Sequence, residues 1–249
     1  MIDLARFFLQ PGQVQGRQVM ISGEDVHHLT RVLRLRVGDT IEVVDPEGQV
    51  YRVRLQEFGE EVCGLIEEEL DYAQESPLDI TLFQGLAKGD KMDYVIQKAV
   101  ELGVKEIIPF TSRFTVVKLE EKKAKTRQAR WERIALEAAK QSKRTRLPVI
   151  GDLHDFSQLT ASVQERSKQN NLVLLAYEGE KVRGMRSLEK PTRAVSVIVG
   201  PEGGFAQEEV DALAMAGATV CTLGPRILRT ETAGLVFLSI IGYKWGDLG

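Results

Sequence analysis

The sequence predicts an α/β protein of two domains, a small β-barrel followed by a parallel sheet flanked by helices. Residues 1–75 contain short, closely spaced runs in which apolar and polar residues alternate, a pattern typical of a small barrel. From residue 76 to residue 249, short apolar runs alternate with segments of helical periodicity. This second pattern favours parallel strands connected by helices.

In the first domain, Gly-Asp, Glu-Gly and Gly-Glu turn signals separate the runs of alternating residues. The four predicted strands cover residues 18–22, 39–45, 49–58 and 62–70. Between the first two strands, Val26, Leu29, Val32 and Leu33 fall at helical spacing and predict a short helix over residues 23–35. Residues 73–79 form the expected linker to the second domain.

The second domain begins with a strand, and Gly103 closes the helix that follows it. Its predicted strands cover residues 79–86, 105–110, 171–178, 194–199 and 218–223. Its predicted helices cover residues 91–103, 125–143 and 207–217, with a final helix that includes residues 233–245. Two of these strands, 194–199 and 218–223, lead directly into loops rich in glycine and charged residues.

Composition excludes several classes of protein. The chain has 249 residues, and its 43% hydrophobic and 28% charged content is ordinary for a globular protein. We find no apolar run of the length that a transmembrane helix needs, and the N-terminus lacks a secretory pattern. Cys63 and Cys221 stand far apart without metal-type spacing, so we expect free thiols and a cytoplasmic protein without a membrane partner.

Charge is distributed unevenly along the chain, whose formal net charge is −3. Residues 55–79 hold nine Asp or Glu and no Lys or Arg, whereas residues 111–150 hold twelve Lys or Arg and four Glu. The basic segment is a candidate surface for a polyanion such as RNA. A solvated helix face with internal ion pairs is the equally open alternative.

Two loops, residues 199–205 and 223–233, follow predicted parallel strands. Ligands bind at the carboxyl ends of such strands, and Gly200, Gly203 and Gly204 would allow backbone to approach a ligand closely. The first loop could instead be a tight turn. The second could simply cap the final helix, with Thr230 as the N-cap residue.

The common nucleotide and catalytic motifs are missing from the sequence. No Gly-Lys-Ser/Thr exists for a phosphate loop, no two glycines stand two positions apart for a dinucleotide fingerprint, and no G-x-S-x-G is present. The three histidines and two cysteines lack metal-ligand spacing. We therefore expect no metal, and chemistry carried by a bound organic cofactor and positioned polar groups.

Five segments, residues 27–39, 88–110, 137–144, 199–205 and 223–233, together resemble the bacterial 16S ribosomal RNA uridine-N3 methyltransferases. This family lies in the trefoil-knotted SPOUT superfamily, and the resemblance covers nearly the whole chain. It implies a PUA-like barrel over residues 1–75 for RNA recognition. It also implies a knotted SPOUT domain over residues 76–249, S-adenosylmethionine as methyl donor, a homodimer, and 16S ribosomal RNA or the small ribosomal subunit as substrate.

The resemblance also implies the site. The expected cofactor-binding residues are Leu175, Gly200, Pro201, Glu202, Gly203, Gly204, Leu223, Gly224, Ile227, Leu228 and Thr230. Uridine N3 is a poor nucleophile until its proton leaves, so a base or a stabilising cation is needed. Glu202 and Glu231 are the candidate bases and Arg229 the candidate cation. Structural pairing of each with a neighbouring segment is the open alternative.

RNA contact is expected from basic residues in three segments. The candidates are Arg31, Arg34, Arg36, Lys88, Lys91, Arg113, Lys140, Arg144 and Arg146. Two rival functions remain at this stage. One is a ribosomal RNA-binding assembly factor without catalysis, and the other is a SPOUT methyltransferase acting on transfer RNA or on a ribose 2′-hydroxyl.

Overall fold

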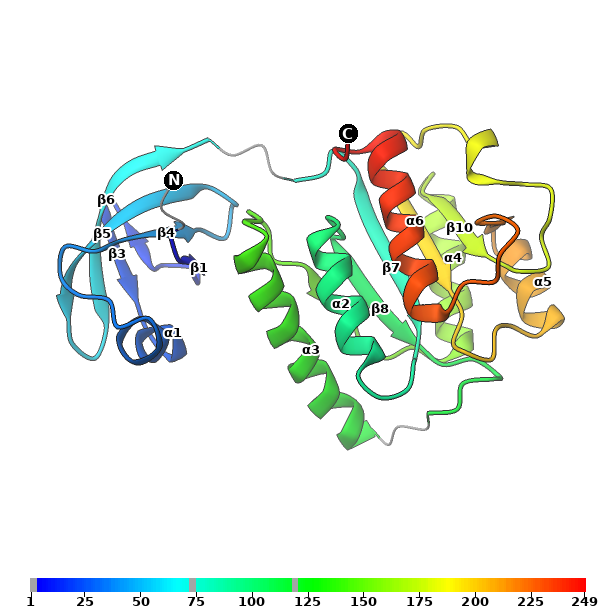
Figure 1. The fold of residues 1–249 in the computed structure, drawn as a ribbon, viewed down its shortest axis with the longest axis horizontal. Coiled ribbons are helices and arrows are strands. Elements are labelled where there is room, and N and C mark those ends of the chain that lie inside the picture. The colour runs from blue at the N-terminus through cyan, green and yellow to red at the C-terminus, as the bar shows by residue number, and fades with distance from the viewer. Residues whose placement is uncertain (1–3, 72–74, 118–120) are drawn as a thin grey trace. The chain divides into compact units, whose positions relative to one another are not determined.

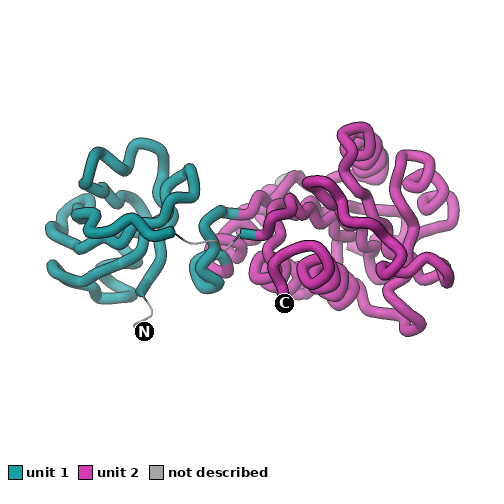
Figure 2. Tube along the Cα trace, turned by 90° about the horizontal axis from the view of Figure 1, so that it is seen from above, with its two compact units in different colours: residues 1–75, 139–147 teal, residues 76–138, 148–249 magenta. Residues whose placement is uncertain are grey.

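The structure is a computed structural model that describes residues 4–71, 75–117 and 121–249 (Figure 1). The chain divides into two compact units (Figure 2). Unit 1 contains residues 1–75 together with residues 139–147, and unit 2 contains residues 76–138 and 148–249. The expected linker over residues 73–79 falls partly outside the described residues. Residues 139–147, which sequence analysis placed in the second domain, belong to the first unit.

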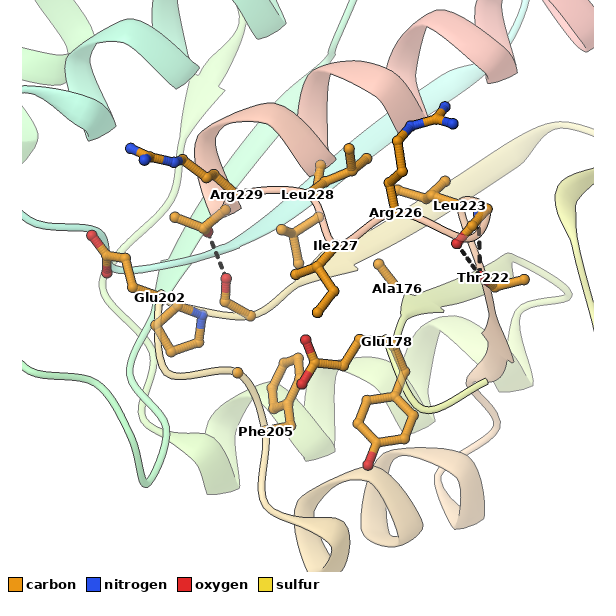
Figure 3. Close-up of a pocket in the computed structure, with 18 of the residues that line it drawn as sticks. Ala176, Glu178, Glu202, Phe205, Thr222, Leu223, Arg226, Ile227, Leu228 and Arg229 are labelled. Atoms are coloured by element: carbon orange, nitrogen blue, oxygen red, sulfur yellow. Dashed lines mark hydrogen bonds between the residues drawn. The ribbon is translucent and has the colours of Figure 1, made fainter. Parts of the chain in front are cut away.

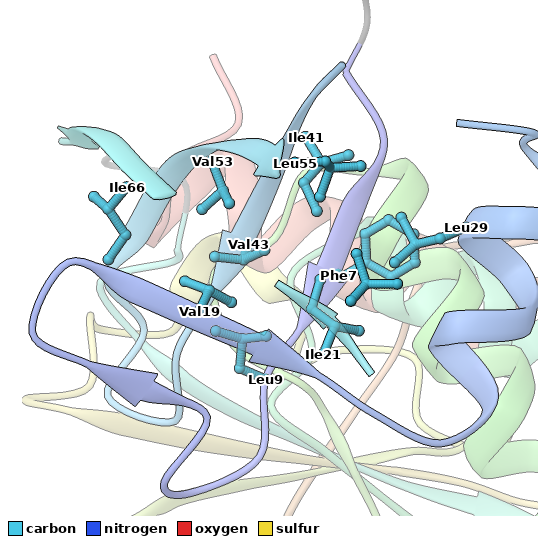
Figure 4. Packing of buried hydrophobic residues seen from close by; sticks show 11 residues of the cluster. Phe7, Leu9, Val19, Ile21, Leu29, Ile41, Val43, Val53, Leu55 and Ile66 are labelled. Carbon is cyan, nitrogen blue, oxygen red and sulfur yellow. The ribbon is translucent and has the colours of Figure 1, made fainter. Parts of the chain in front are cut away.

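Unit 1 is built on one six-stranded sheet in the order β1-β4-β5-β6-β3-β2. Its strands are β1 (Arg6–Phe8), β2 (Val14–Gln15), β3 (Gln18–Ile21), β4 (Thr40–Val44), β5 (Val50–Phe58) and β6 (Val62–Leu70). Only the β1–β4 pair is parallel among these pairs. Alternate residues of the strands point inward and form the core that Figure 4 shows, with Phe7, Ile41, Val53 and Leu55 almost fully buried.

The predicted helix over residues 23–35 is shorter and irregular in the structure. One turn of α-helix, α1 (Glu24–His27), continues into a π-helical turn, η1 (His28–Val32). The Leu33 N–H donates to the His28 carbonyl at 3.0 Å, the five-residue step of a π-helix. Arg34 then adopts a left-handed conformation with φ of 56°, which ends the segment.

Unit 1 is completed by the turn that contains residues 139–147. The Glu75 carboxylate accepts hydrogen bonds from Arg144 Nη2 at 2.6 Å, from the Thr145 N–H at 2.9 Å and from the Arg146 N–H at 3.0 Å. The buried guanidinium of Arg6 pairs with Glu42 and also donates to the carbonyls of Lys143 and Arg144. These polar contacts join chain segments that lie far apart in the sequence.

Unit 2 is a six-stranded, fully parallel sheet in the order β12-β10-β11-β7-β8-β9. Its strands are β7 (Asp79–Gly85), β8 (Glu106–Phe110), β9 (Val149–Ile150), β10 (Leu172–Ala176), β11 (Ala194–Val199) and β12 (Thr219–Cys221). Strand β10 lies between β11 and β12, so the three strands do not follow chain order across the sheet. The direction in which successive strands are added therefore reverses around β10 and β11. A change of this kind creates a crevice at the carboxyl ends of the strands.

Helices cover the sheet of unit 2. They are α2 (Lys91–Glu101), α3 (Glu121–Gln141), α4 (Phe156–Lys168), α5 (Gln207–Met215) and α6 (Thr230–Trp245), with a 3₁₀ turn, η2 (Met185–Ser187). Helix α6 packs on α2 and on strands β7 and β11, while α4 packs on β10 and α5 on β12 (Figure 1). Sequence analysis predicted four of these helices and did not predict α4.

Candidate active site

A cavity of about 400 Å³ lies at the carboxyl ends of β10, β11 and β12 (Figure 3). Its walls come from the three loops that follow these strands and from the first residues of α2 and α6. The lining residues are Lys91, Ala176, Tyr177, Glu178, Val199, Gly200, Pro201, Glu202, Gly204, Phe205, Thr222, Leu223, Gly224, Arg226, Ile227, Leu228, Arg229, Thr230 and Ala233. Its volume suits one ligand of the size of a nucleoside derivative.

A short chain of hydrogen bonds holds two of the loops together. Gln84 Nε2 donates to Thr230 Oγ1 at 2.9 Å, and Thr230 Oγ1 donates to the Gly200 carbonyl at 2.6 Å. Both side chains are buried. Thr230 is the first residue of α6, whereas Arg229 occupies the N-cap position and makes no side-chain cap. The alternative in which Thr230 serves only as the N-cap residue is therefore wrong, because its hydroxyl joins the loops instead.

The loop after β11 packs tightly against the end of β7. A Cβ atom added at Gly85 would lie 2.3 Å from the Pro201 nitrogen, so only glycine fits there. Within the loop, the Gly204 N–H donates to the Pro201 carbonyl at 2.9 Å, and Gly204 has φ of 68°. That conformation suits glycine. The backbone of residues 200–204 thus forms a compact turn at the cavity wall.

A second set of contacts holds the loop after β11 on the side away from the cavity. Glu209, which is buried on α5, accepts from the Ala206 N–H at 3.0 Å and from the Arg113 N–H at 2.8 Å. A Cβ added at Gly203 would lie 2.7 Å from Phe114 Cβ and 2.9 Å from the Phe114 carbonyl oxygen. The loop after β8 therefore supports the cavity loop from behind.

Charged residues gather at one end of the cavity. Lys91 Nζ lies 3.3 Å from Glu202 Oε1 and 3.2 Å from Glu231 Oε2. Partial burial raises the pKa of the Glu202 carboxyl, but hydrogen bonds from the backbone N–H groups of Lys88 and Glu202 and from Lys91 bring it below its ordinary value. Contact with Glu231, followed by Glu202, raises the pKa of the Lys91 ammonium. Lys91 and Glu202 therefore carry opposite charges at neutral pH.

Most of the expected cofactor residues line the cavity. These are Gly200, Pro201, Glu202, Gly204, Leu223, Gly224, Ile227, Leu228 and Thr230, together with the candidate cation Arg229. Leu175 does not line it; its side chain is fully buried in the core between β10 and α4, so its expected place at the wall is corrected. Gly203 faces Phe114, and Glu231 reaches Lys91 from outside the cavity lining.

Sequence analysis missed the segment after β10. Ala176, Tyr177 and Glu178 all line the cavity, and in Figure 3 the Glu178 carboxylate lies between Ile227 and Phe205. Tyr177 Oη also donates to Gln207 Oε1 at 3.1 Å, which connects this segment to α5. The signal was available, because β10 is a parallel strand and its carboxyl end must lie at the same edge as those of β11 and β12.

The expected RNA contacts divide into three groups. Arg31, Arg34, Arg36, Lys88, Arg113 and Arg146 are exposed. Lys140 and Arg144 are buried, and they form ion pairs with Asp25 and Glu75 inside unit 1. These two residues stabilise the fold and are corrected as RNA contacts. Lys91 is bound to the two carboxylates at the cavity.

Within residues 4–71, 75–117 and 121–249, no group of three or more His, Cys, Asp or Glu side chains could hold a metal ion. In the same ranges no helix has the length and apolar content to cross a bilayer.

Comparison with known proteins places the chain in a family. Residues 74–242 match the family model described as an RNA methyltransferase domain, and residues 21–61 match the model described as an RNA methyltransferase PUA domain. The chain belongs to this RNA methyltransferase family. The second match also identifies unit 1 as a PUA-like domain.

Relatives in the RNA methyltransferase family match over the full length. Ribosomal RNA small subunit methyltransferase E of Bacillus subtilis is 38% identical, with 97% of each chain covered. The protein of the same name from Aquifex aeolicus is 35% identical and covers 91% of this chain and 95% of its own. The solved structure of ribosomal RNA small subunit methyltransferase E from Neisseria gonorrhoeae, bound to S-adenosylmethionine, has a TM-score of 0.89 at 33% identity and covers 99% of this chain and all of its own.

Proposed function

We propose that this protein transfers a methyl group from S-adenosylmethionine to N3 of a uridine in 16S ribosomal RNA. The observation that carries this proposal is the cavity at the strand ends, walled by residues 199–205 and 222–230 in a chain of the RNA methyltransferase family. Relatives named ribosomal RNA small subunit methyltransferase E, one of them bound to S-adenosylmethionine, support the donor and the RNA.

The residues present fit this cofactor. The cavity combines apolar walls from Leu223, Ile227, Leu228 and Phe205 with the glycines Gly200, Gly204 and Gly224, which suits a flat heterocycle with hydrogen-bonding edges. Glu178 supplies one carboxylate in the same space for a hydroxyl or ammonium group. When bound, S-adenosylmethionine supplies a methyl group already activated on a sulfonium.

The chain must therefore align the uracil and manage the proton on N3. Arg229 is exposed at the rim of the cavity, where its guanidinium can stabilise negative charge on the uracil as that proton leaves. Glu231 and Glu202 are the nearby carboxylates that can accept the proton. Because hydrogen bonds lower the pKa of the Glu202 carboxyl, Glu202 is a weaker base than an ordinary glutamate.

Recognition of RNA is proposed to use the exposed cations Arg31, Arg34, Arg36, Lys88, Arg113 and Arg146. A base edge used in pairing is reached only when the base is unpaired or turned out of the stack, so a second recognition module such as a PUA-like domain is useful. We also propose a cytoplasmic homodimer, a trefoil knot in unit 2 and the small ribosomal subunit as the assembled substrate. Exposed Tyr94 on α2 and Tyr243 on α6 offer apolar surface for a second copy.

A methylation assay tests this function. The purified protein is incubated with radiolabelled S-adenosylmethionine in three parallel reactions. The RNA in these reactions is naked 16S ribosomal RNA, small ribosomal subunits or transfer RNA. Nuclease digestion and mass spectrometry then locate the label. We expect 3-methyluridine at one position of 16S ribosomal RNA. Label on a ribose hydroxyl or on transfer RNA would contradict the proposal, and cofactor binding without transfer to any RNA would favour an assembly factor.

A further inference from the structure

The cluster of Lys91, Glu202 and Glu231 joins three separate segments at the cavity. Lys91 is the first residue of α2, Glu202 lies in the loop after β11, and Glu231 lies in the first turn of α6. The side chains of Lys91, Glu202 and Glu231 are 34%, 25% and 18% exposed. The ammonium of Lys91 is thus partly withdrawn from water between two carboxylates, whereas a lysine that contacts RNA phosphate extends into solvent.

Glu202 is held from two sides. Its Oε1 accepts from the Lys88 N–H at 3.0 Å and from Lys91 Nζ at 3.3 Å. Glu231 Oε2 is shielded from solvent and has no hydrogen-bond partner of good geometry within the described part of the chain. Within that part, Lys91 Nζ forms an ion pair with this oxygen at 3.2 Å. Burial of a carboxylate oxygen away from water costs free energy unless a cation or a hydrogen-bond donor pairs with it. Removal of the Lys91 charge would therefore leave Glu231 Oε2 without this cation, and Glu202 Oε1 would keep only the Lys88 N–H of its two partners.

We infer that Lys91 is a positioning residue of the transfer site, whose ammonium fixes the carboxylates of Glu202 and Glu231 in one ionised arrangement at the cavity. The inference rests on the proposed function for its kinetic consequences, and it deepens that function by assigning Lys91 to the handling of the N3 proton. The proton would pass from N3 to a carboxylate oxygen, and the electron pair left on N3 would form the bond to the methyl carbon. The methyl–sulfur bond of S-adenosylmethionine would break in the same step, and its electron pair would stay on sulfur as a neutral thioether. A carboxylate can receive that proton only if it is ionised and correctly placed.

Other charged groups surround the cluster, and each must be considered in a titration. Lys88 and Asp90 precede Lys91 on the same loop, and Arg229 lies on the cavity rim. On the side of α2 that faces α3, Asp93 pairs with Arg130. Among these groups, Lys88 is the matched comparison, because it is exposed and only its backbone N–H contacts Glu202.

The test compares Lys91→Met, Lys91→Arg and Lys88→Met. In Lys91→Met, loss of the ammonium should raise the pKa of the Glu202 carboxyl, so the acidic limb of the kcat profile should move to higher pH. We expect kcat to fall about 10²-fold, the effect of a small misplacement at a reacting centre. S-adenosylmethionine affinity and the thermal midpoint should stay close to those of the wild type, and Lys91→Arg should restore most of the rate. Lys88→Met should raise the KM for RNA and leave the kcat profile in place.

A carboxyl titration by carbon-13 NMR gives a readout that does not depend on activity. The Glu202 carboxyl should titrate at higher pH in Lys91→Met than in the wild type, whether or not the RNA substrate is correct. If the wild type makes no 3-methyluridine, the proposed function fails while this titration still decides the role of Lys91. An unchanged Glu202 titration, or a Lys91→Met variant whose only defects are a higher KM for RNA and a weaker salt dependence, would overturn the inference.

Discussion

Thr230 shows how a single hydroxyl can connect a cofactor cavity to the sheet below it. Its Oγ1 accepts a hydrogen bond from Gln84 Nε2 and donates one to the Gly200 carbonyl. The side chains of Gln84 and Thr230 are both buried. Gln84 Oε1 is buried without a hydrogen bond among the described residues, so Nε2 alone fixes the orientation of this amide in that part of the chain. A buried amide that loses its partner incurs the full cost of desolvation.

The first prediction removes that hydroxyl while keeping the shape of the side chain. Thr230→Val should lower the free energy of unfolding by about 1–3 kcal/mol, because Gln84 Nε2 and the Gly200 carbonyl each lose a partner. The loop after β11 should also loosen, so affinity for S-adenosylmethionine should fall. Urea denaturation and calorimetry measure the two effects. Thr232→Val, an exposed change in the same helical turn, is the control; equal cofactor affinity in the two variants would contradict the linkage.

The second prediction concerns the exposed arginine at the cavity rim. If Arg229 stabilises the uridine anion, Arg229→Ala should lose about 10²–10³ in kcat, since one stabilising donor is removed. Cofactor affinity and thermal stability should persist, because the Arg229 side chain makes no cap on α6. Single-turnover methylation at saturating RNA and cofactor measures the loss, and high pH should restore part of it. Wild-type turnover would exclude the role.

At the scale of elements, the loop after β11 packs on the loop after β8. This packing gives Gly203 a different role from the one expected from the sequence. Gly203 was expected to admit a ligand close to its backbone. The structure turns it toward Phe114, where a Cβ atom would meet both the side chain and the carbonyl oxygen. Gly203 is therefore required for the packing of the loop after β11 on the loop after β8, and it acts on the cavity through that packing.

The third prediction follows from this contact. Gly203→Ala should displace the loop after β11 and weaken S-adenosylmethionine binding, and Gly203→Val should weaken it more, because the nearest atoms include backbone that cannot move aside. Isothermal calorimetry on folded variants measures the effect. Gly184→Ala is a matched control, since its backbone φ is −93° and an added Cβ would meet no atom within 4 Å. Unaltered affinity in Gly203→Val would show that the two loops are not coupled.

Much of the element pattern could be read from sequence, since local periodicity reports which face of a strand or helix is buried. The alternating strands and helices of unit 2 and the loops 199–205 and 223–233 follow from that signal. The place of Leu175 could not be read, because an apolar residue at the end of a strand fits a core and a cavity wall equally well. Lys140 and Arg144 were misassigned for a related reason: charge in a sequence does not show that Asp25 and Glu75 neutralise it in the fold.

At the scale of the whole molecule, the first unit is discontinuous in sequence. Glu75 accepts from Arg144, Thr145 and Arg146, which belong to a segment separated from residues 1–75 by more than sixty residues of unit 2. The fourth prediction is that Glu75→Gln lowers the free energy of unfolding of unit 1 by about 1–3 kcal/mol, because the buried guanidinium of Arg144 loses the charge of its partly exposed partner. Native-state hydrogen exchange resolves the effect on each unit. Glu60→Gln, an exposed change in unit 1, should have no such effect.

The fifth prediction uses the balance of charge over the molecule. The net charge is −3, so affinity for RNA must come from local groups of cations such as Arg31, Arg34 and Arg36. Binding should weaken steeply with salt, and Arg31→Ala/Arg34→Ala should reduce the slope of log K against log salt by about 1–2, since each phosphate contact contributes about 0.7–0.9. Fluorescence anisotropy at a series of salt concentrations measures this slope. Arg52→Ala, which removes a cation already paired with Glu68, should leave the slope in place; an unchanged slope in the double variant would exclude the assignment.

The contact between Arg6 and the carbonyls of Lys143 and Arg144 also constrains the order of events during synthesis. A ribosome adds roughly 5–20 residues per second, so about 4–14 s separate the appearance of residue 75 from that of residue 147. Throughout that interval the six strands exist without the turn that completes their packing, and the buried Arg6 and the partly buried Glu75 lack part of their hydrogen bonds. Folding of the N-terminal unit on the ribosome therefore has to wait for the helix that follows β8 to be translated. Pulse proteolysis of stalled nascent chains should show protection of residues 4–71 only after residue 147 has left the tunnel.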